Sequence, residues 1–406
     1  MKKIKIVYYN PKPSGCTWYR FIIPITALKA LDLVDFEYLY FKSEYPEIQS
    51  DDLEKLKTCD IFHIAREWTA YGSLLIKEAK KLGKKIWYDV DDNLFNIPTW
   101  NVAYKVFTQP RVRNGLLDIL KQVDLVTITQ DKLREEYVKH TKAPIKILPN
   151  IAPYGFFKKE VKEDGYIRIL WAGSQTHVDD LKLIEPVIEQ ILKEFPNVYF
   201  TFVGFCLPSI LNLDKVRIKL VDPDVFVQTY YVNLMKASPD IALAPLADVN
   251  FNWYKSNIKL LEYGTLDCAV VASKIGEYGK FIKHKQEGLL CSKYIEWYKA
   301  LKLLITNAEI RKILSTNLRN KVNALCNPSV FVGWYNMFLE LLKIEDSGTI
   351  NIETGFFEKW YNLIYEASTF YEMYMPMTNA KPVAQDINKT QDDLDDFFKQ
   401  NKASAT

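Results

Sequence analysis

Residues 167–181 have the sequence IRILWAGSQTHVDDL, in which a β-branched and aromatic run leads through a glycine into a polar segment. Residues 167–172 are typical of a buried strand, and Gly173 permits a tight turn and a close backbone approach. Ser174 and Thr176 are suited either to capping the following helix or to donating hydroxyl groups to an anion at its N-terminus. The stretch predicts a strand, loop and helix of the kind that bind ligands at the carboxyl edge of a parallel sheet.

The same alternation of strand-like and helix-like segments extends over most of the chain. Strands are expected at residues 3–9, 36–41, 61–64, 85–90, 125–129 and 145–148, and again at 167–172, 198–203, 216–220, 241–245 and 269–273. Helical segments lie between them, which implies parallel sheets with helices on both faces. We therefore predict an α/β protein of two doubly wound, Rossmann-like domains that face each other across a cleft.

The same patterns predict the domain boundaries. We expect an N-terminal domain at 1–152, a linker at 153–165, a second domain at 166–328, a crossover helix at 329–343 and a helical C-terminal extension at 344–406. The linker is suggested by two turn-forming residues and the charged run KKEVKEDG. In the extension, aromatic residues recur at helical spacing over 356–375, ahead of a polar tail. This stripe is expected either to dock on the core or to mediate self-association.

The composition excludes several classes of protein. With 53 Lys and Arg against 50 Asp and Glu, the formal net charge is +3, too low to indicate a polyelectrolyte-binding protein. A hydrophobic fraction of 48% excludes wholesale disorder. No uncharged run reaches the ~20 apolar residues that span a bilayer, and no signal peptide is evident, so a cytoplasmic location is expected. Six scattered cysteines and four histidines lack metal-ligand spacing and predict no metal site.

A second segment with chemical potential is KSNIKLLEYG, residues 255–264. Ser256 or Asn257 is a suitable N-cap, so free backbone amides and the nearby Lys255 can meet a diphosphate. Glu262 lies one to two turns into the helix, where its carboxylate can accept both hydrogens of a ribose diol. The alternative is an amphipathic helix with solvated charges, which the apolar neighbours of Glu262 disfavour.

A third segment is YDVDDNLF, residues 88–95, at the end of an expected strand. Strand alternation places Asp89 and Asp91 on one side, while Asp92 begins the loop. Three interpretations remain open: carboxylates of an acceptor site, turn and capping residues, or ligands of Mn²⁺ or Mg²⁺. Arg20, in the first glycine-containing loop, is expected either to bind a diphosphate or to form an interdomain ion pair.

Together these motifs resemble those of GT-B-fold retaining glycosyltransferases of the group 1 or family 4 type, bacterial or phage. The resemblance covers residues 1–343 and also includes SGCTWYR, residues 14–20. It implies transfer of a sugar from a nucleoside-diphosphate sugar, with retention and with no required metal or other cofactor. The acceptor is unidentified and is expected to be a glycan, a protein or a modified nucleic acid.

The resemblance assigns roles to individual residues. Glu262 is expected to bind the ribose, whereas the family's acidic sugar contact, eight positions earlier, is replaced here by Tyr254. Lys259, with Lys255, would stabilise the diphosphate as it leaves. The expected donor-binding set is Gly15, Arg20, Gly173, Ser174, Thr176, Lys255, Ser256, Asn257 and Glu262, and the expected catalytic set is Asp91, Asp92 and Lys259.

Two alternatives compete with a general glycosyltransferase. One is a phage-type enzyme that glycosylates DNA bases, which would act in the host cytoplasm and would need a basic groove. The other is a catalytically inactive protein that binds sugar nucleotides or serves a structural role, an alternative supported by Tyr254.

Overall fold

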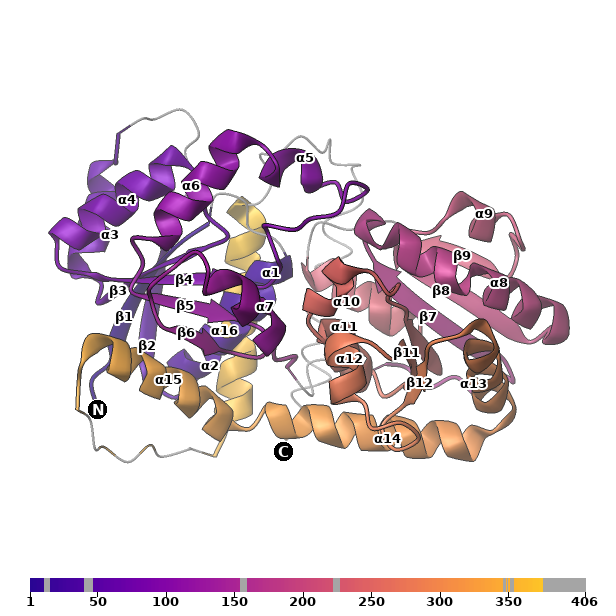
Figure 1. Ribbon diagram of the computed structural model, residues 1–406. Helices are drawn as coiled ribbons and strands as arrows, with labels where there is room; N and C mark the ends of the chain where they lie inside the picture. Colours follow the sequence, from indigo (N-terminus) through magenta and orange to yellow (C-terminus); the bar gives the residue numbers. More distant parts are fainter. Residues whose placement is uncertain are drawn as a thin grey trace.

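The chain folds into two parallel six-stranded β-sheets with flanking helices (Figure 1). The computed structural model describes residues 1–10, 15–39, 47–153, 159–221, 227–345, 348, 350 and 354–374. The prediction of two doubly wound, Rossmann-like domains is confirmed, because each sheet is built from parallel strands joined through helices. The domain boundaries themselves remain predictions, and residues 154–158 of the expected linker lie outside the described part.

The N-terminal sheet has the strand order β2-β1-β3-β4-β5-β6. Its strands are β1 (Ile4–Tyr9), β2 (Val34–Leu39), β3 (Ile61–Ala65), β4 (Lys85–Val90), β5 (Leu125–Ile128) and β6 (Ile145–Ile147). The helices between them are α1 (Gly15–Thr17), the π-helix η1 (Trp18–Ile22), α2 (Ile23–Ala30), α3 (Ser50–Thr58), α4 (Ala70–Lys81), α5 (Tyr104–Phe107), α6 (Pro110–Leu120) and α7 (Asp131–Tyr137). The continuous buried run of β4, in the interior of the sheet, is typical of a strand covered on both faces.

The C-terminal sheet has the strand order β12-β11-β10-β7-β8-β9. Its strands are β7 (Ile167–Gly173), β8 (Val198–Gly204), β9 (Ile218–Val221), β10 (Ile241–Ala244), β11 (Ala269–Ser273) and β12 (Leu289–Cys291). Its helices are η2 (Gln175–His177), α8 (Val178–Glu194), α9 (Pro208–Leu211), α10 (Val227–Lys236), η3 (Asn250–Tyr254), α11 (Ile258–Thr265), α12 (Gly276–Phe281), α13 (Tyr294–Thr306) and α14 (Ala308–Leu325).

Parallel register brings the chemically interesting strand ends together. Asp89 of β4 lies beside Ala65 of β3 and Thr127 of β5, so Arg66 and Asp91 both follow neighbouring strands at the same edge. In the second sheet, Gly173 at the end of β7 pairs with Gly204 at the end of β8. These are the carboxyl edges at which open α/β sheets bind ligands.

Two C-terminal helices return the chain to the N-terminal domain (Figure 1). In α15 (Pro328–Leu342), the Tyr335 hydroxyl donates to the carbonyl of Lys2 at 2.7 Å, and Phe338 packs on Trp87 with ring centroids 5.0 Å apart. In α16 (Phe356–Tyr374), the buried Trp360 donates from its indole nitrogen to the carbonyl of Ile23 at 3.1 Å. The aromatic stripe therefore docks on α2, and the polar tail from residue 375 lies outside the described residues.

Within the described part of the chain, no helix is both long enough and apolar enough to cross a membrane.

Replacing Trp360 by alanine removes a fully buried indole and its hydrogen bonds to α2. We expect the free energy of unfolding of the N-terminal domain to fall by about 3–5 kcal/mol, measured by equilibrium urea unfolding. Lys359→Ala, at the adjacent exposed position of α16, is the matched control and should change stability by less than about 0.5 kcal/mol. Equal stability of the two variants would show that α16 does not contribute to the core.

Candidate functional site

Two glycines shape the floor of the candidate site. A Cβ atom on Gly173 would lie 2.8 Å from the Nζ atom of Lys259, and one on Gly204 would lie 2.5 Å from the carbonyl oxygen of Gly173. Gly204 also has φ = +99°, a backbone conformation that side chains disfavour. The absence of a side chain on Gly173 therefore leaves room for Lys259, and its absence on Gly204 allows the two strand ends to lie close together. Gly173 was expected from the sequence, whereas Gly204 was missed because its contact is with a neighbouring strand.

Lys259 is the most deeply placed cation of the site. It lies in the first turn of α11, donates to the carbonyl of Ala172 and has its ammonium 5.3 Å from the centre of the Trp171 ring. Burial lowers the pKa of Lys259 to about 8. An anion placed here would favour the protonated lysine and be bound by it.

His177 is a polar residue of the loop after β7 for which no role was predicted from the sequence. Its Nδ1 atom lies 2.6 Å from a carboxylate oxygen of Asp180, whose other oxygen accepts from the amide of Ala247 at 2.7 Å and from Asn252 at 2.8 Å. Burial, together with the charge of Lys259, lowers the pKa of His177 to about 4. His177 is therefore neutral at pH 7.

The side chains of Ser174 and Thr176, in the loop after β7, are more accessible to solvent than Lys259. Ser174 is exposed, and its Oγ atom lies 2.8 Å from Oγ1 of Thr176 and 3.4 Å from the Thr176 amide. Ser174 therefore caps the short helix η2, one of the two expected functions, whereas anion binding by these hydroxyls remains a prediction. Gly15, on the N-terminal side, begins α1, and a Cβ there would meet nothing within 4 Å.

Glu262 is buried, and its carboxylate accepts hydrogen bonds from two tyrosines. One carboxylate oxygen accepts from the Tyr19 hydroxyl of the N-terminal domain, and the other accepts from Tyr230 at 3.0 Å. Burial raises the pKa of Glu262. Neither tyrosine was expected from the sequence, because both are distant in the chain and lie in aromatic-rich segments that resemble ordinary core.

The start of α11 is joined to the N-terminal domain by polar contacts. Ser256 accepts from the side-chain amide of Asn150 at 2.9 Å. Lys255 donates to both oxygens of Asp92, at 3.0 and 3.2 Å. Asn257 stands at the N-cap of α11 without a side-chain capping bond, so its expected capping hydrogen bond is not formed.

The three acidic residues at the end of β4 and just after it have different partners. Asp89 is buried and its two oxygens are taken by Arg20, at 2.6 and 3.0 Å. Asp91 lies 3.3 Å from Arg66, and Asp92 faces Lys255. Burial opposes the ionisation of Asp92, but the nearby Lys255 and Arg66 hold its pKa below the ordinary range.

Arg20 is held by residues of its own domain, and Asn150 links it to Ser256 of the expected donor-binding set. Besides Asp89, its guanidinium donates to the carbonyl of Leu148 and to the side chain of Asn150 at 3.2 Å. Arg20 thus forms a buried ion pair within its own domain, not between domains. The metal interpretation of the acidic segment gains no partner residues, since no group of three or more potential metal ligands occurs among the described residues.

Tyr254, at the position where the resembling family has an acidic sugar contact, packs in the protein core. Tyr254 is only 8% exposed and, with Phe251, joins the core cluster of the N-terminal domain. The ammonium of Lys132 lies 5.9 Å from the centre of its ring. Tyr254 therefore contributes to the contact between η3 and α7.

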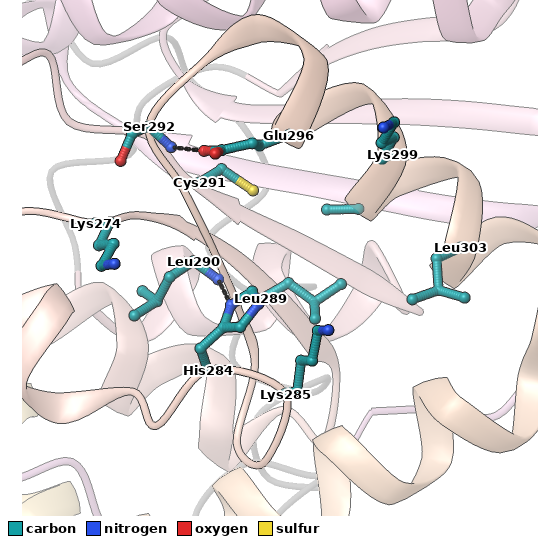
Figure 2. A pocket seen from close by; sticks show the side chains of 11 residues that line it. Lys274, His284, Lys285, Leu289, Leu290, Cys291, Ser292, Glu296, Lys299 and Leu303 are labelled. Atoms are coloured by element: carbon teal, nitrogen blue, oxygen red, sulfur yellow. Dashed lines mark hydrogen bonds between the residues drawn. The ribbon is translucent and has the colours of Figure 1, made fainter.

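A separate cavity of about 460 Å³ lies on the outer edge of the C-terminal domain, beside β12 and α13 (Figure 2). It is lined by basic and apolar residues, among them Lys274, His284, Lys285, Leu289 and Lys299. The Nδ1 atom of His284 accepts from the amide of Leu290 at 2.9 Å, so this histidine caps an edge strand. The cavity contains none of the expected site residues.

Comparisons with known proteins give likeness of fold and not of sequence. The chain matches no family model, and no curated protein is significantly similar to it. HepE from Anabaena, solved with UDP-glucose, is similar with a TM-score of 0.60 at 13% identity, over 83% of this chain and 99% of HepE. For a glycosyltransferase from Rickettsia africae the TM-score is 0.55 at 15% identity, covering 85% and 100%. For sucrose-phosphate synthase from Thermosynechococcus elongatus it is 0.54 at 14%, covering 84% and 100%.

At these identities the comparisons establish the fold, which is the two-domain GT-B fold. The covered share spans nearly the whole length of each neighbour, so both domains take part in the likeness. The expectation of a GT-B architecture is therefore confirmed. Arg66 and Asp91 follow strands at the carboxyl edge of its first sheet, and Gly173 and Gly204 end strands at that of its second.

Proposed function

We propose that this chain, with its GT-B fold, is a glycosyltransferase that transfers a sugar from a nucleoside-diphosphate sugar to an acceptor. One observation carries the proposal: a buried carboxylate, Glu262, and a buried lysine, Lys259, share the short helix α11, and a second lysine, Lys255, lies just before that helix. A carboxylate suits a ribose diol, and cations suit a diphosphate. HepE, a structural neighbour, was solved with UDP-glucose, which agrees with this class of donor.

The two lysines supply the electrostatic part of the mechanism. Negative charge develops on the diphosphate as the bond to the sugar breaks, and fixed cations nearby stabilise that charge more than they stabilise the intact donor. Lys259 is anchored by Ala172 and Trp171, so it needs little rearrangement to act. We assign Ser174, Thr176 and the amides at the starts of α8 and α11 to the same diphosphate.

The N-terminal domain would hold the acceptor. Asp91 follows β4 at the cleft edge and is oriented by Arg66, so its carboxylate can accept a hydrogen bond from an acceptor hydroxyl. Asp92 is adjacent and is held ionised by Lys255 and Arg66. We propose retention of configuration, with the acceptor proton passing to the leaving diphosphate or to one of these carboxylates. The acceptor is assigned only to the glycan, protein or modified nucleic acid classes.

One specific observation favours a second candidate, a protein that binds sugar nucleotides without transferring the sugar. The position that holds an acidic sugar contact in the resembling family is Tyr254, which packs against the N-terminal domain. Such a protein would keep Glu262 and both lysines. Binding of a donor without its hydrolysis or transfer would favour this second candidate.

The nucleotide assignment is tested by calorimetry with UDP, GDP, ADP and dTDP and their glucose derivatives. Glu262→Gln should weaken the preferred diphosphate about tenfold or more, since hydrogen bonds to charged groups contribute about 1.5–3 kcal/mol each. Affinity for inorganic pyrophosphate, which has no ribose, should not fall. Unchanged nucleotide affinity would refute the role of Glu262, and donor binding abolished by EDTA and restored by Mn²⁺ would refute metal independence.

The acceptor assignment predicts a different pattern for Asp91. Asp91→Asn should slow sugar transfer at least tenfold while leaving diphosphate affinity unchanged, because Asp91 contacts Arg66 of its own domain and not Lys255 or Lys259. Donor hydrolysis without acceptor is the control activity. Transfer at the wild-type rate would mean that Asp91 is a turn residue.

Affinity for the diphosphate should depend on pH through Lys259. The pKa of this lysine is about 8, so it is charged at pH 7 and loses its proton as the pH rises through that value. Binding of an anion favours the charged form, and affinity should therefore fall above pH 8 by up to about tenfold per pH unit. Calorimetry between pH 7 and 9.5 measures the trend, and Lys259→Arg, which keeps its charge, should remove it. A flat profile for the wild type would contradict the assignment.

A further inference from the structure

We propose that Tyr19 and Asp92 of the N-terminal domain form a latch that occupies the donor-binding groups of the C-terminal domain and must be displaced by the donor. The inference rests on the proposed function, because it takes Glu262 as the ribose-binding group and Lys255 as a diphosphate-binding group. It concerns how access to that site is controlled. In the latch, each N-terminal side chain makes the kind of contact that the excluded part of the donor would make: a hydroxyl donor to Glu262 and an anion beside Lys255.

The first contact imitates the ribose. The Tyr19 hydroxyl donates to one oxygen of Glu262, as a ribose hydroxyl would, while Tyr230 donates to the other oxygen at 3.0 Å. Because the two tyrosines hold both oxygens of a carboxylate that is also buried, a ribose diol can reach Glu262 only if a tyrosine withdraws. Tyr230 belongs to the same domain as Glu262, so Tyr19 is the partner that domain movement removes.

A relay of hydrogen bonds fixes Tyr19 in this place. The indole nitrogen of Trp18 donates to the Tyr231 hydroxyl at 2.9 Å, Tyr231 donates to Tyr19, and Tyr19 donates to Glu262. Each hydroxyl accepts once and donates once, so the chain has one consistent direction and ends on the carboxylate. Trp18, Tyr19 and Tyr231 are all buried, so water does not compete for these groups.

The second contact imitates the diphosphate. Both oxygens of Asp92 accept from the ammonium of Lys255, at 3.0 and 3.2 Å, as two oxygens of a phosphate would. The two side chains are 18% and 20% exposed, so the ion pair is partly shielded from solvent. Asp92 thereby neutralises a cation that the donor needs.

Tyr19 and Asp92 both lie on well-packed elements of the N-terminal domain. Tyr19 lies in the π-helix η1, a rare element that often marks functional sites, and η1 runs into α2, which Trp360 of α16 supports. Asp92 follows the buried strand β4 and its carbonyl accepts from Tyr137 at 2.9 Å. The two contacts should therefore break together, by rotation of one domain against the other, and not by separate side-chain motions.

The latch makes a prediction opposite in sign to a donor-binding role for Tyr19. If Tyr19 excludes the ribose, removal of its hydroxyl raises the open fraction and tightens nucleotide binding. If Tyr19 instead holds the nucleotide, the same change weakens binding. Asp92→Asn gives a second, independent reading, because an amide cannot replace the ion pair with Lys255.

The experiment uses the full chain and calorimetry with UDP, GDP, ADP and dTDP on the wild type, Tyr19→Phe, Asp92→Asn and the double variant. Each single variant should bind the preferred diphosphate about three- to tenfold more tightly, and the double variant more tightly still. Tyr335→Phe is the matched control, since it also loses a tyrosine hydrogen bond between distant segments but lies away from the cleft. Its nucleotide affinity should equal that of the wild type.

Small-angle scattering without nucleotide provides a readout that does not depend on the donor. The double variant should have a larger radius of gyration than the wild type, and Tyr335→Phe should not. Weaker or unchanged binding by both single variants, with wild-type binding intact, would overturn the latch and leave the proposed function standing. Failure of every variant to bind any of the four diphosphates would overturn the proposed function, and the latch with it.

Discussion

The buried ion pair between Arg20 and Asp89 is the contact on which the geometry of the cleft depends. It joins the π-helix to the end of β4, and the same guanidinium reaches Leu148 and Asn150, where the chain leaves the N-terminal domain. A buried charge without its partner is costly, so these three segments are held in one arrangement. That arrangement also positions the residues close to the ion pair in the sequence, which are Tyr19 beside Arg20, and Asp91 and Asp92 after Asp89.

The two carboxylates of the cleft are paired with cations, one across the domain boundary and one within its own domain. Asp92 meets Lys255, while Asp91 is balanced by Arg66 within its own domain. Arg66 adopts φ = +52°, which is uncommon for a residue with a side chain, and its amide donates to the carbonyl of Asp89 at 3.0 Å. Backbone strain at a cleft residue is often associated with function, and here it turns a cation toward the proposed acceptor carboxylates.

The sequence predicted what local patterns can encode. Hydrophobic periodicity was sufficient for the two parallel sheets, and the glycine and helix-start motifs led to Gly173, Lys259 and Glu262, which the fold brings to one sheet edge. It did not predict the partner of Arg20, because Asp89 is 69 positions away in the chain. The tyrosines around Glu262 were missed for the same reason, since Tyr19 and Glu262 are separated by 243 positions. Such pairs follow from tertiary packing, of which a single sequence carries no local signal.

The return of α15 and α16 to the first domain has a consequence for synthesis on the ribosome. The C-terminal sheet and its helices, from β7 to α14, are formed by one continuous segment of the chain. The core of the N-terminal domain, in contrast, also includes Phe338 and Trp360, which come after that segment. During translation, the core residues of the C-terminal domain are therefore complete before those of the N-terminal domain, although the C-terminal domain begins later in the chain. Until Trp360 emerges, a nascent chain leaves the α2 surface uncovered, so an apolar surface remains that a chaperone could protect.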